Sequence, residues 1–559
     1  MRKIISWGNR HWVLLTSFLL LLYLLIFSLQ GFDMTDEGFM LANYQQFFHH
    51  PESVGYSFVY YLTCFFGGIW NELFGFAGNY GFRVFNALII IISYIIICKV
   101  LKDYHSYRWW IFLGFVVVVF GMNVDHGTLS FHYYTFNAFN SVVITYLLYS
   151  GLLNNKMTSI FCACALIGAN MFSRIPSLSL IVIPFALSFI VYLYRKSQFN
   201  WKRVCFIELC GIIVGFLLVI GLMHLLGHQS IFWHSIKVNI LLASHSVSTN
   251  SLGSMFVQYV INYLYVILFM SIAIAFIWGY GRFFRKNSYL KILFVGVLFF
   301  VLYRLNYSHL LGRMYLLVAL LYVCLLYVMW KNRKDERLIV LCSILLAISL
   351  LLPLGSDWGI GNMGAYSIWG LVPTTLVLAA KDIDSSRNKS DYKSILVLVF
   401  MFLALVYFKH NVRICFRDDG PRWEKNYHMK SSAYASVLTS MQRGEELDSL
   451  LVFCSKTIKA EERVFVFPSM PGIHYLSSTI PYAYCSWPMC YSTASFEIEL
   501  DRAKQELGLA PFVISLNHFT IQNDQHKGNY HIFDEYMRNY HKIWSSVHYS
   551  VWRPQNVNK

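Results

Sequence analysis

Charged residues are scarce in this sequence. Only 13% of the 559 residues are charged, whereas 57% are hydrophobic and 18% are aromatic. A soluble globular protein has about 25% charged residues, so the scarcity excludes a chain built only from ordinary soluble domains. Most of the length is used by apolar runs near the length that crosses a bilayer as a helix, about 20 residues.

Several motif classes are missing as well. The twelve cysteines form no Cys-x-x-Cys pair and no spacing typical of a metal site. Cys485 and Cys490 can form a disulfide if that part of the chain lies outside the cell, and free thiols remain the alternative. There is no internal repeat, no low-complexity stretch and no nucleic-acid motif. Nucleic acid is therefore not an expected partner.

No cleavage site follows the first apolar run. The N-terminus, with Arg2 and Lys3 ahead of the run 12–29, is similar to a signal peptide. The run exceeds the hydrophobic region of such a peptide, about 7–15 residues, and no small-x-small pattern follows it. We therefore expect an uncleaved first transmembrane span.

The apolar runs predict a polytopic α-helical membrane protein with about thirteen transmembrane helices. A membrane module is expected over residues 1–408, and the tail 409–559 forms a second domain. The predicted spans are 12–30, 84–101, 109–122, 133–152, 157–172, 177–194, 204–226, 256–280, 288–303, 314–331, 338–354, 366–380 and 394–408.

The loops between these spans separate by charge. One alternate set is rich in lysine and arginine, from Arg2 and Lys3 at the start to Lys393 at the end. Basic loops stay in the cytoplasm, so the N-terminus is predicted to be cytoplasmic. An odd number of spans then places the tail outside, in the periplasm of a bacterial inner-membrane protein. The other set holds few bases: Arg83, Arg174, Lys237, Arg304 and Arg313.

The tail from 409 to 559 differs in composition. It has 17 lysines and arginines against 15 acidic residues, so it carries little of the net charge of +16. Residues 463–468 and 511–516 are typical of short buried strands, and helical patterns near 431–456 and 494–508 flank them. This order predicts a small extracytoplasmic α/β domain.

Three carboxylates directly follow the first span, in Asp33-Met-Thr-Asp36-Glu37. One interpretation is that Thr35 or Asp36 caps a helix at 37–48, where acidic residues suit the helix start. The other is that a carboxylate activates an acceptor hydroxyl or holds a divalent metal ion. A second segment at 56–74 lies in the same outer loop, 31–83. Both segments are expected to lie along the membrane surface.

The few outer cations are further candidates. Arg83 and Arg174 stand where the chain re-enters the membrane. They either extend to lipid headgroups or bind the phosphate of a lipid-linked donor. Arg304 is a weaker candidate of the same kind. Asp125, next to His126, is either part of a polar loop or a group that ligates metal or moves protons.

The order of these features resembles a known family. Asp36-Glu37-Gly-Phe-Met-Leu-Ala42 follows the first span, an interfacial segment comes next, and Phe82-Arg83-Val-Phe-Asn-Ala87 opens the second span. This is similar to the GT-C membrane glycosyltransferases, in particular the protein mannosyltransferase and lipid A aminoarabinose transferase group. The turn Arg174-Ile-Pro176 and the tail segment 464–472 are also similar. The family's Pro-Pro pair is absent, since Pro51 stands alone.

The resemblance implies a reaction. A polyprenyl-phosphate sugar would lie among the membrane lipids with its phosphate at the outer surface, where Arg83 and Arg174 offset its charge. Asp36 would take the proton of a hydroxyl on a glycan, lipid or protein acceptor. The hydroxyl oxygen would then attack the anomeric carbon of the sugar and invert its configuration. Asp33, Glu37 or Asp125 would position groups or bind a metal ion. No second Asp-x-Asp follows, so the oligosaccharyltransferase branch is disfavoured.

Two other functions remain open from sequence. A transporter of lipid or glycan places charges or broken helices at mid-membrane, and the predicted spans hold few charges. Another type of envelope polysaccharide polymerase or ligase would carry its long outer loop between late spans. In this sequence the long loop follows the first span, and a folded tail follows the last.

Overall fold

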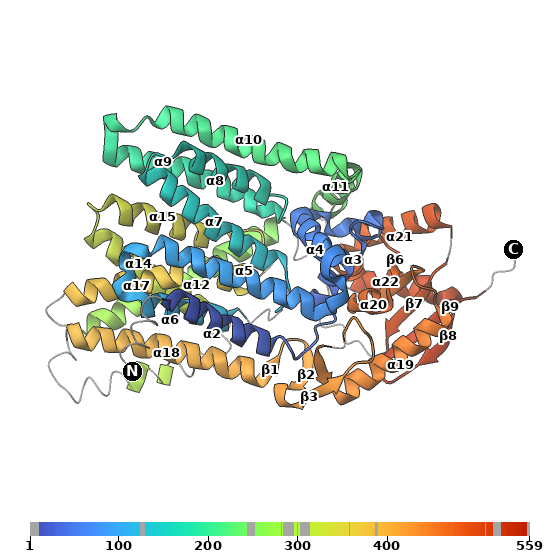
Figure 1. The fold of residues 1–559 in the computed structure, drawn as a ribbon. Coiled ribbons are helices and arrows are strands. Elements are labelled where there is room, and N and C mark those ends of the chain that lie inside the picture. The colour runs from blue at the N-terminus through green and yellow to red at the C-terminus, as the bar shows by residue number, and fades with distance from the viewer. Residues whose placement is uncertain are drawn as a thin grey trace.

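The structure is a computed structural model. It describes residues 11–555 apart from 123–128, 243–251, 281, 283–295, 299, 302–303, 305–313, 357, 386–388, 435, 509 and 518–526. Asp125 is therefore outside the described residues. In Figure 1 long helices form a bundle, and the strands gather with the last helices at one end of it.

The bundle consists of apolar helices that run back and forth along one axis (Figure 1). Six helical stretches of the described chain are long and apolar enough to cross a membrane, and further apolar helices are shorter. The bundle helices are α2 (Trp12–Phe27), α5 (Gly78–Val100), α6 (Arg108–Gly121), α7 (Tyr133–Leu153), α8 (Met157–Asn170), α9 (Val182–Arg195), α10 (Trp201–Leu225), α12 (Leu252–Gly279), α14 (Tyr315–Lys331), α15 (Glu336–Leu351), α16 (Ile360–Ser367), α17 (Leu371–Ser385) and α18 (Lys389–Arg413).

Each predicted span coincides with a helix except 288–303, most of which lies outside the described residues. The predicted start of the span 366–380 was wrong. Residues Ile368 to Gly370 form a turn after α16, and the next helix begins at Leu371. The apolar side chains of that turn, Ile368 and Trp369, are buried, so an apolar run alone did not reveal the break.

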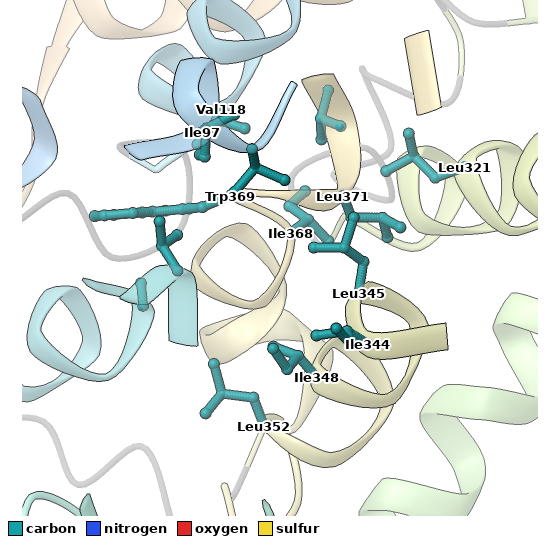
Figure 2. Close-up of a cluster of buried hydrophobic side chains, with 14 of the residues drawn as sticks. Ile97, Val118, Leu321, Ile344, Leu345, Ile348, Leu352, Ile368, Trp369 and Leu371 are labelled. Carbon is teal, nitrogen blue, oxygen red and sulfur yellow. The ribbon is translucent and has the colours of Figure 1, made fainter. Parts of the chain in front are cut away.

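The interior of the bundle is made of aliphatic side chains around Trp369. Figure 2 shows this side chain in one cluster with Ile97, Val118, Ile344, Leu345 and Leu371, which come from α5, α6, α15 and α17. Burial of such side chains contributes about 1.5–3 kcal/mol each. Where α8 and α10 cross, a Cβ at Gly215 would lie 1.8 Å from the Ala165 carbonyl oxygen. Small residues let membrane helices approach this closely.

The first long loop is helical. It contains α3 (Asp36–Gln46), the 3₁₀ segment η1 (Pro51–Tyr60) and α4 (Tyr61–Phe74). These match the two segments predicted at 37–48 and 56–74. In Figure 1 α3 and α4 lie between the bundle and the strand-rich end. A further short helix, α11 (Gln229–Ile236), and the π-helical segment η6 (Lys237–Leu242) follow α10.

The tail is a small α/β unit. Its main sheet has the strand order β6-β5-β7-β9-β8, in which β5 is parallel to β6 and β7, and β9 is antiparallel to β7 and β8. Its elements are β1 (Ile414–Cys415), β2 (Asp418–Pro421), β3 (Lys425–His428), β4 (Leu438–Ser440), α19 (Met441–Thr457), β5 (Arg463–Phe467), α20 (Gly472–Ser477), β6 (Ile480–Pro481), α21 (Thr493–Leu507), β7 (Phe512–Leu516), α22 (Lys527–Tyr536), β8 (Tyr540–Ser545) and β9 (Tyr549–Pro554).

The sequence predicts two of these strands and the helix near 494–508 correctly. The pattern near 431–456 is helical only from Met441, because residues 438–440 form β4 and pair with β3. Cys485 and Cys490 are not joined by a disulfide in the structure.

Candidate functional site

The stretch between α2 and α3 is held by the tail. The Gly31 amide donates to the Leu438 carbonyl at 2.8 Å, and the Phe32 amide donates to the Asp418 carboxylate at 3.0 Å. A Cβ at Gly38 would lie 2.5 Å from the Cα of Gly472 in α20, so glycine at both positions permits the contact. The three carboxylates of the first loop therefore lie at the junction of bundle and tail.

Arg83 and Glu37 form a buried ion pair at this junction. Nε and Nη2 of Arg83 donate to the two carboxylate oxygens of Glu37 at 2.9 and 2.8 Å. The other N–H groups donate to the carbonyls of Ser28, Gln30 and Gly31. The side chains of Arg83 and Glu37 are only 4% and 1% exposed.

These five bonds use all five N–H donors of the guanidinium. Arg83 therefore fastens α5 to the end of α2 and the start of α3, and it has no N–H left for a phosphate. Glu37 has both oxygens engaged. In this arrangement both side chains hold the first loop in place, and the predicted roles of Arg83 in phosphate binding and of Glu37 in catalysis stay predictions.

Asp33 caps α3. Its Oδ1 accepts from the Thr35 amide at 2.8 Å, and its Oδ2 accepts from the amides of Asp36 and Glu37 at 3.2 and 3.3 Å. These are the amides that a helix start leaves without partners. The sequence suggested Thr35 or Asp36 as the capping side chain, and the structure corrects this to Asp33. The predicted role of Asp33 in substrate binding stays a prediction.

Asp36 differs from its neighbours because it faces a cation of the tail. Its Oδ2 lies 3.1 Å from Nη1 of Arg417, and the two side chains are 21% and 37% exposed. Nη1 of Arg417 also donates to the hydroxyl of Thr35. Of the three acids in the first loop, Asp36 is thus the one with the most accessible carboxylate, since Asp33 and Glu37 are buried.

Arg417 is carried by the tight turn between β1 and β2. Its φ of 50° lies in the left-handed region, which residues other than glycine adopt rarely. The turn is anchored by Asp418, which is buried and accepts from Lys425, Thr439, Arg443 and the Phe32 amide. Burial by itself lowers the pKa of Arg417, but the charges of Asp36 and Asp33 raise it above its ordinary value overall.

The bundle contributes two tyrosines near this pair. The rings of Tyr134 in α7 and Tyr366 in α16 stack with their centroids 5.2 Å apart. Tyr134 lies within electrostatic range of Arg417, and Tyr366 within that of Asp36. The pair Asp36–Arg417 is therefore bordered by aromatic side chains from the membrane module.

The remaining predicted residues lie apart or outside the described chain. Nη1 and Nη2 of Arg174 donate to the carbonyls of Leu352 and Leu354 at 2.7 and 2.9 Å, which closes the end of α15. Arg174 also acts electrostatically on Tyr133, the neighbour of Tyr134 in α7. Arg304 is exposed. Within the described ranges no group of three or more His, Cys, Asp or Glu side chains could hold a metal ion.

Sequence reasoning missed Arg417. The tail has nearly balanced charge, so none of its arginines stood out, whereas the scarcity of bases in the outer loops drew attention to Arg83 and Arg174. A signal did exist, because the turn residues Asp419-Gly420-Pro421 begin two positions after Arg417. The pairing of this turn with Asp36 depends on tertiary contacts and was not readable from spacing.

Comparisons with known proteins give a match in structure only. No protein-family model matches the chain, and no curated protein does. The crystal structure of ArnT from Cupriavidus metallidurans in the apo state superposes with a TM-score of 0.50 at 10% identity, over 98% of both chains. ArnT bound to undecaprenyl phosphate gives a TM-score of 0.49 at 11% identity, over 97% of both chains.

At this identity the likeness shows the fold. The chain is a polytopic membrane protein with a GT-C-like fold and a small α/β tail, and this confirms the fold class that the sequence predicts.

Proposed function

We propose that the chain is a glycosyltransferase that moves a sugar from a polyprenyl-phosphate donor to a hydroxyl acceptor at the outer face of the membrane. The observation that carries the proposal is the contact of Asp36 with Arg417, which joins a partly exposed carboxylate and a partly exposed guanidinium within a GT-C-like fold. The donor class is that implied by the sequence motifs, and ArnT itself binds a carrier of this type.

The two side chains supply complementary chemistry. Asp36 accepts the proton of the acceptor hydroxyl, and the hydroxyl oxygen forms a bond to the anomeric carbon. The bond from that carbon to the phosphate oxygen breaks, and its electron pair leaves with the polyprenyl phosphate. Arg417 stabilises the negative charge that grows on this phosphate.

The ion pair sets the order of events. In the structure Arg417 pairs with Asp36. When a donor phosphate binds Arg417, the guanidinium turns part of its donors to that phosphate. Asp36 then has an oxygen available for the acceptor. Glu37, Arg83 and Asp33 hold the start of α3 so that Asp36 keeps its place.

A reconstitution assay tests the function. Purified protein in liposomes is supplied with a radiolabelled polyprenyl-phosphate sugar and with membrane extract as the source of acceptor. We expect transfer of label with this donor and none with a nucleotide sugar. Label transferred from the nucleotide sugar alone would contradict the proposal. Absence of any product with several types of polyprenyl-phosphate sugar would also contradict it, provided that the membrane extract comes from cells in which the reaction occurs.

A further inference from the structure

A cavity lies between the first long loop and the tail. Its volume is about 350 Å³, and it is bordered by η1, by α11 and η6, and by α21. Figure 1 shows α11 near α21 at the tail end of the bundle. Ligand pockets have volumes of about 300–1,000 Å³, so this cavity fits a small ligand group. Its lining includes Tyr56, His234, Asn239, Tyr484, Glu499 and Arg502.

A buried carboxylate stands at the centre of the polar lining. The side chain of Glu499 is 1% exposed, and its Oε1 lies 2.7 Å from Nε2 of His234. Its Oε2 accepts from Nη1 of Arg502 at 3.3 Å. Nη1 of Arg502 also lies 2.9 Å from the same Nε2. One ring nitrogen cannot donate to Glu499 and accept from Arg502 at once. Only one of the two contacts is therefore a hydrogen bond, and the other leaves either an acceptor site on Glu499 or an N–H of Arg502 for a ligand hydroxyl.

Asn239 provides a second incomplete group. Its Nδ2 donates to the Tyr56 carbonyl at 3.3 Å and to the Ser235 hydroxyl at 3.1 Å. Its Oδ1 is buried and has no hydrogen-bond partner among the residues that the structure describes. A buried acceptor without a donor carries a cost in free energy. A ligand that donates a hydrogen bond to this oxygen would recover that free energy.

The lining indicates the chemistry of the ligand. Donors from His234 and Arg502 alternate with acceptors from Glu499 and Asn239, and hydroxyl groups can serve both kinds because each one donates and accepts. Glu52 adds a second carboxylate to the lining. Two carboxylates against one guanidinium disfavour a phosphate or carboxylate ligand. Tyr56 and Tyr491 add aromatic side chains to the lining, against which the apolar C–H groups of a sugar can pack.

We propose that this cavity, whose lining includes neither Asp36 nor Arg417, binds an uncharged sugar residue of the acceptor glycan. This inference rests on the proposed function for the identity of its ligand as an acceptor. Such a cavity would let the protein recognise its acceptor glycan through a sugar residue other than the one whose hydroxyl is glycosylated.

Binding of glycans to the full-length protein in lipid nanodiscs, without any polyprenyl donor, tests the proposal. The probe is an array of neutral, carboxylated and phosphorylated oligosaccharides. We expect retention of neutral glycans, and at least tenfold weaker binding for both Glu499→Gln and Asn239→Ala. Asp501→Asn is the matched control, because Asp501 is an exposed residue of the same helix that pairs with Lys504, and it should bind as the wild type does.

Three outcomes would overturn the inference: no glycan is retained, the acidic glycans bind best, or Asn239→Ala binds like the wild type. Asn239→Ala keeps the test decisive if Glu499→Gln fails to fold. The array contains no donor and therefore tests binding alone. If the array retains neutral glycans but the liposome assay shows no transfer, only the proposed function is contradicted.

Discussion

At the scale of single residues, neighbouring carboxylates in the first loop have different tasks. Asp33 caps a helix, Glu37 neutralises Arg83, and Asp36 faces Arg417. Three acids within five positions thus share no function, because each meets a different partner in the fold. The carboxylate that is left accessible is the one to which we assign chemistry.

Arg83 is predicted to act on stability. Removal of one partner from a buried ion pair costs about 3–5 kcal/mol, because the other charge stays behind in the interior. We expect Arg83→Ala to lower the thermal unfolding temperature and the yield of folded protein. Arg203→Ala, which removes an exposed arginine of α10, serves as the control. A stable Arg83→Ala protein that has lost only donor affinity would show that Arg83 binds phosphate after all.

At the scale of elements, α20 links the tail to α3. His474 of α20 is buried, and its burial lowers its pKa from 6.5 to about 3. In the unfolded chain the ring binds a proton near pH 6.5, whereas in the folded chain it stays neutral. The folded state therefore binds fewer protons than the unfolded state between these pH values. The contribution of His474 to the free energy of unfolding is fully present above pH 6.5 and is lost progressively as the pH falls from 6.5 towards 3.

Hydrogen exchange in α20 and β5 measures this effect. Between pH 6.5 and 5.5 we expect the free energy of opening to fall by roughly 1 kcal/mol, since one pKa unit corresponds to about 1.4 kcal/mol. His474→Gln should remove this dependence, whereas His541→Gln, at an exposed histidine, should retain it. An opening free energy of the wild type that is constant over this range would refute the assignment.

The elements also show what could be predicted from sequence. The strands at Arg463–Phe467 and Phe512–Leu516 are short apolar runs between turns, and such runs are readable locally. The turn at Ile368 to Gly370 could not be predicted locally, because its residues are as apolar as those of the helices on either side. The pairing of Asp36 with Arg417 was also hidden, since it depends on how a turn of the tail packs on the first loop.

At the scale of the whole molecule, the tail and the first long loop must lie on one side of the membrane, because they share the Asp36–Arg417 contact. The loop charges predict that this side is the outer one. In right-side-out vesicles a membrane-impermeant maleimide should label Glu72→Cys and Glu445→Cys above the background of the parent protein. Lys202→Cys should react only in inside-out vesicles. The reverse pattern would contradict the predicted orientation.

The central claim is that Asp36 and Arg417 form the transfer site. It is tested most directly by transfer rates from a labelled polyprenyl-phosphate sugar for the wild type, Asp36→Asn, Arg417→Ala and the control Asp501→Asn, with thermal unfolding measured alongside. General base catalysis contributes about 10²–10⁴-fold, so we expect Asp36→Asn to lose transfer by that order while it stays folded. For Arg417→Ala we expect a loss of about 10²–10³-fold, since it lacks one stabilising donor. A folded Asp36→Asn protein that transfers sugar at the wild-type rate would contradict the account.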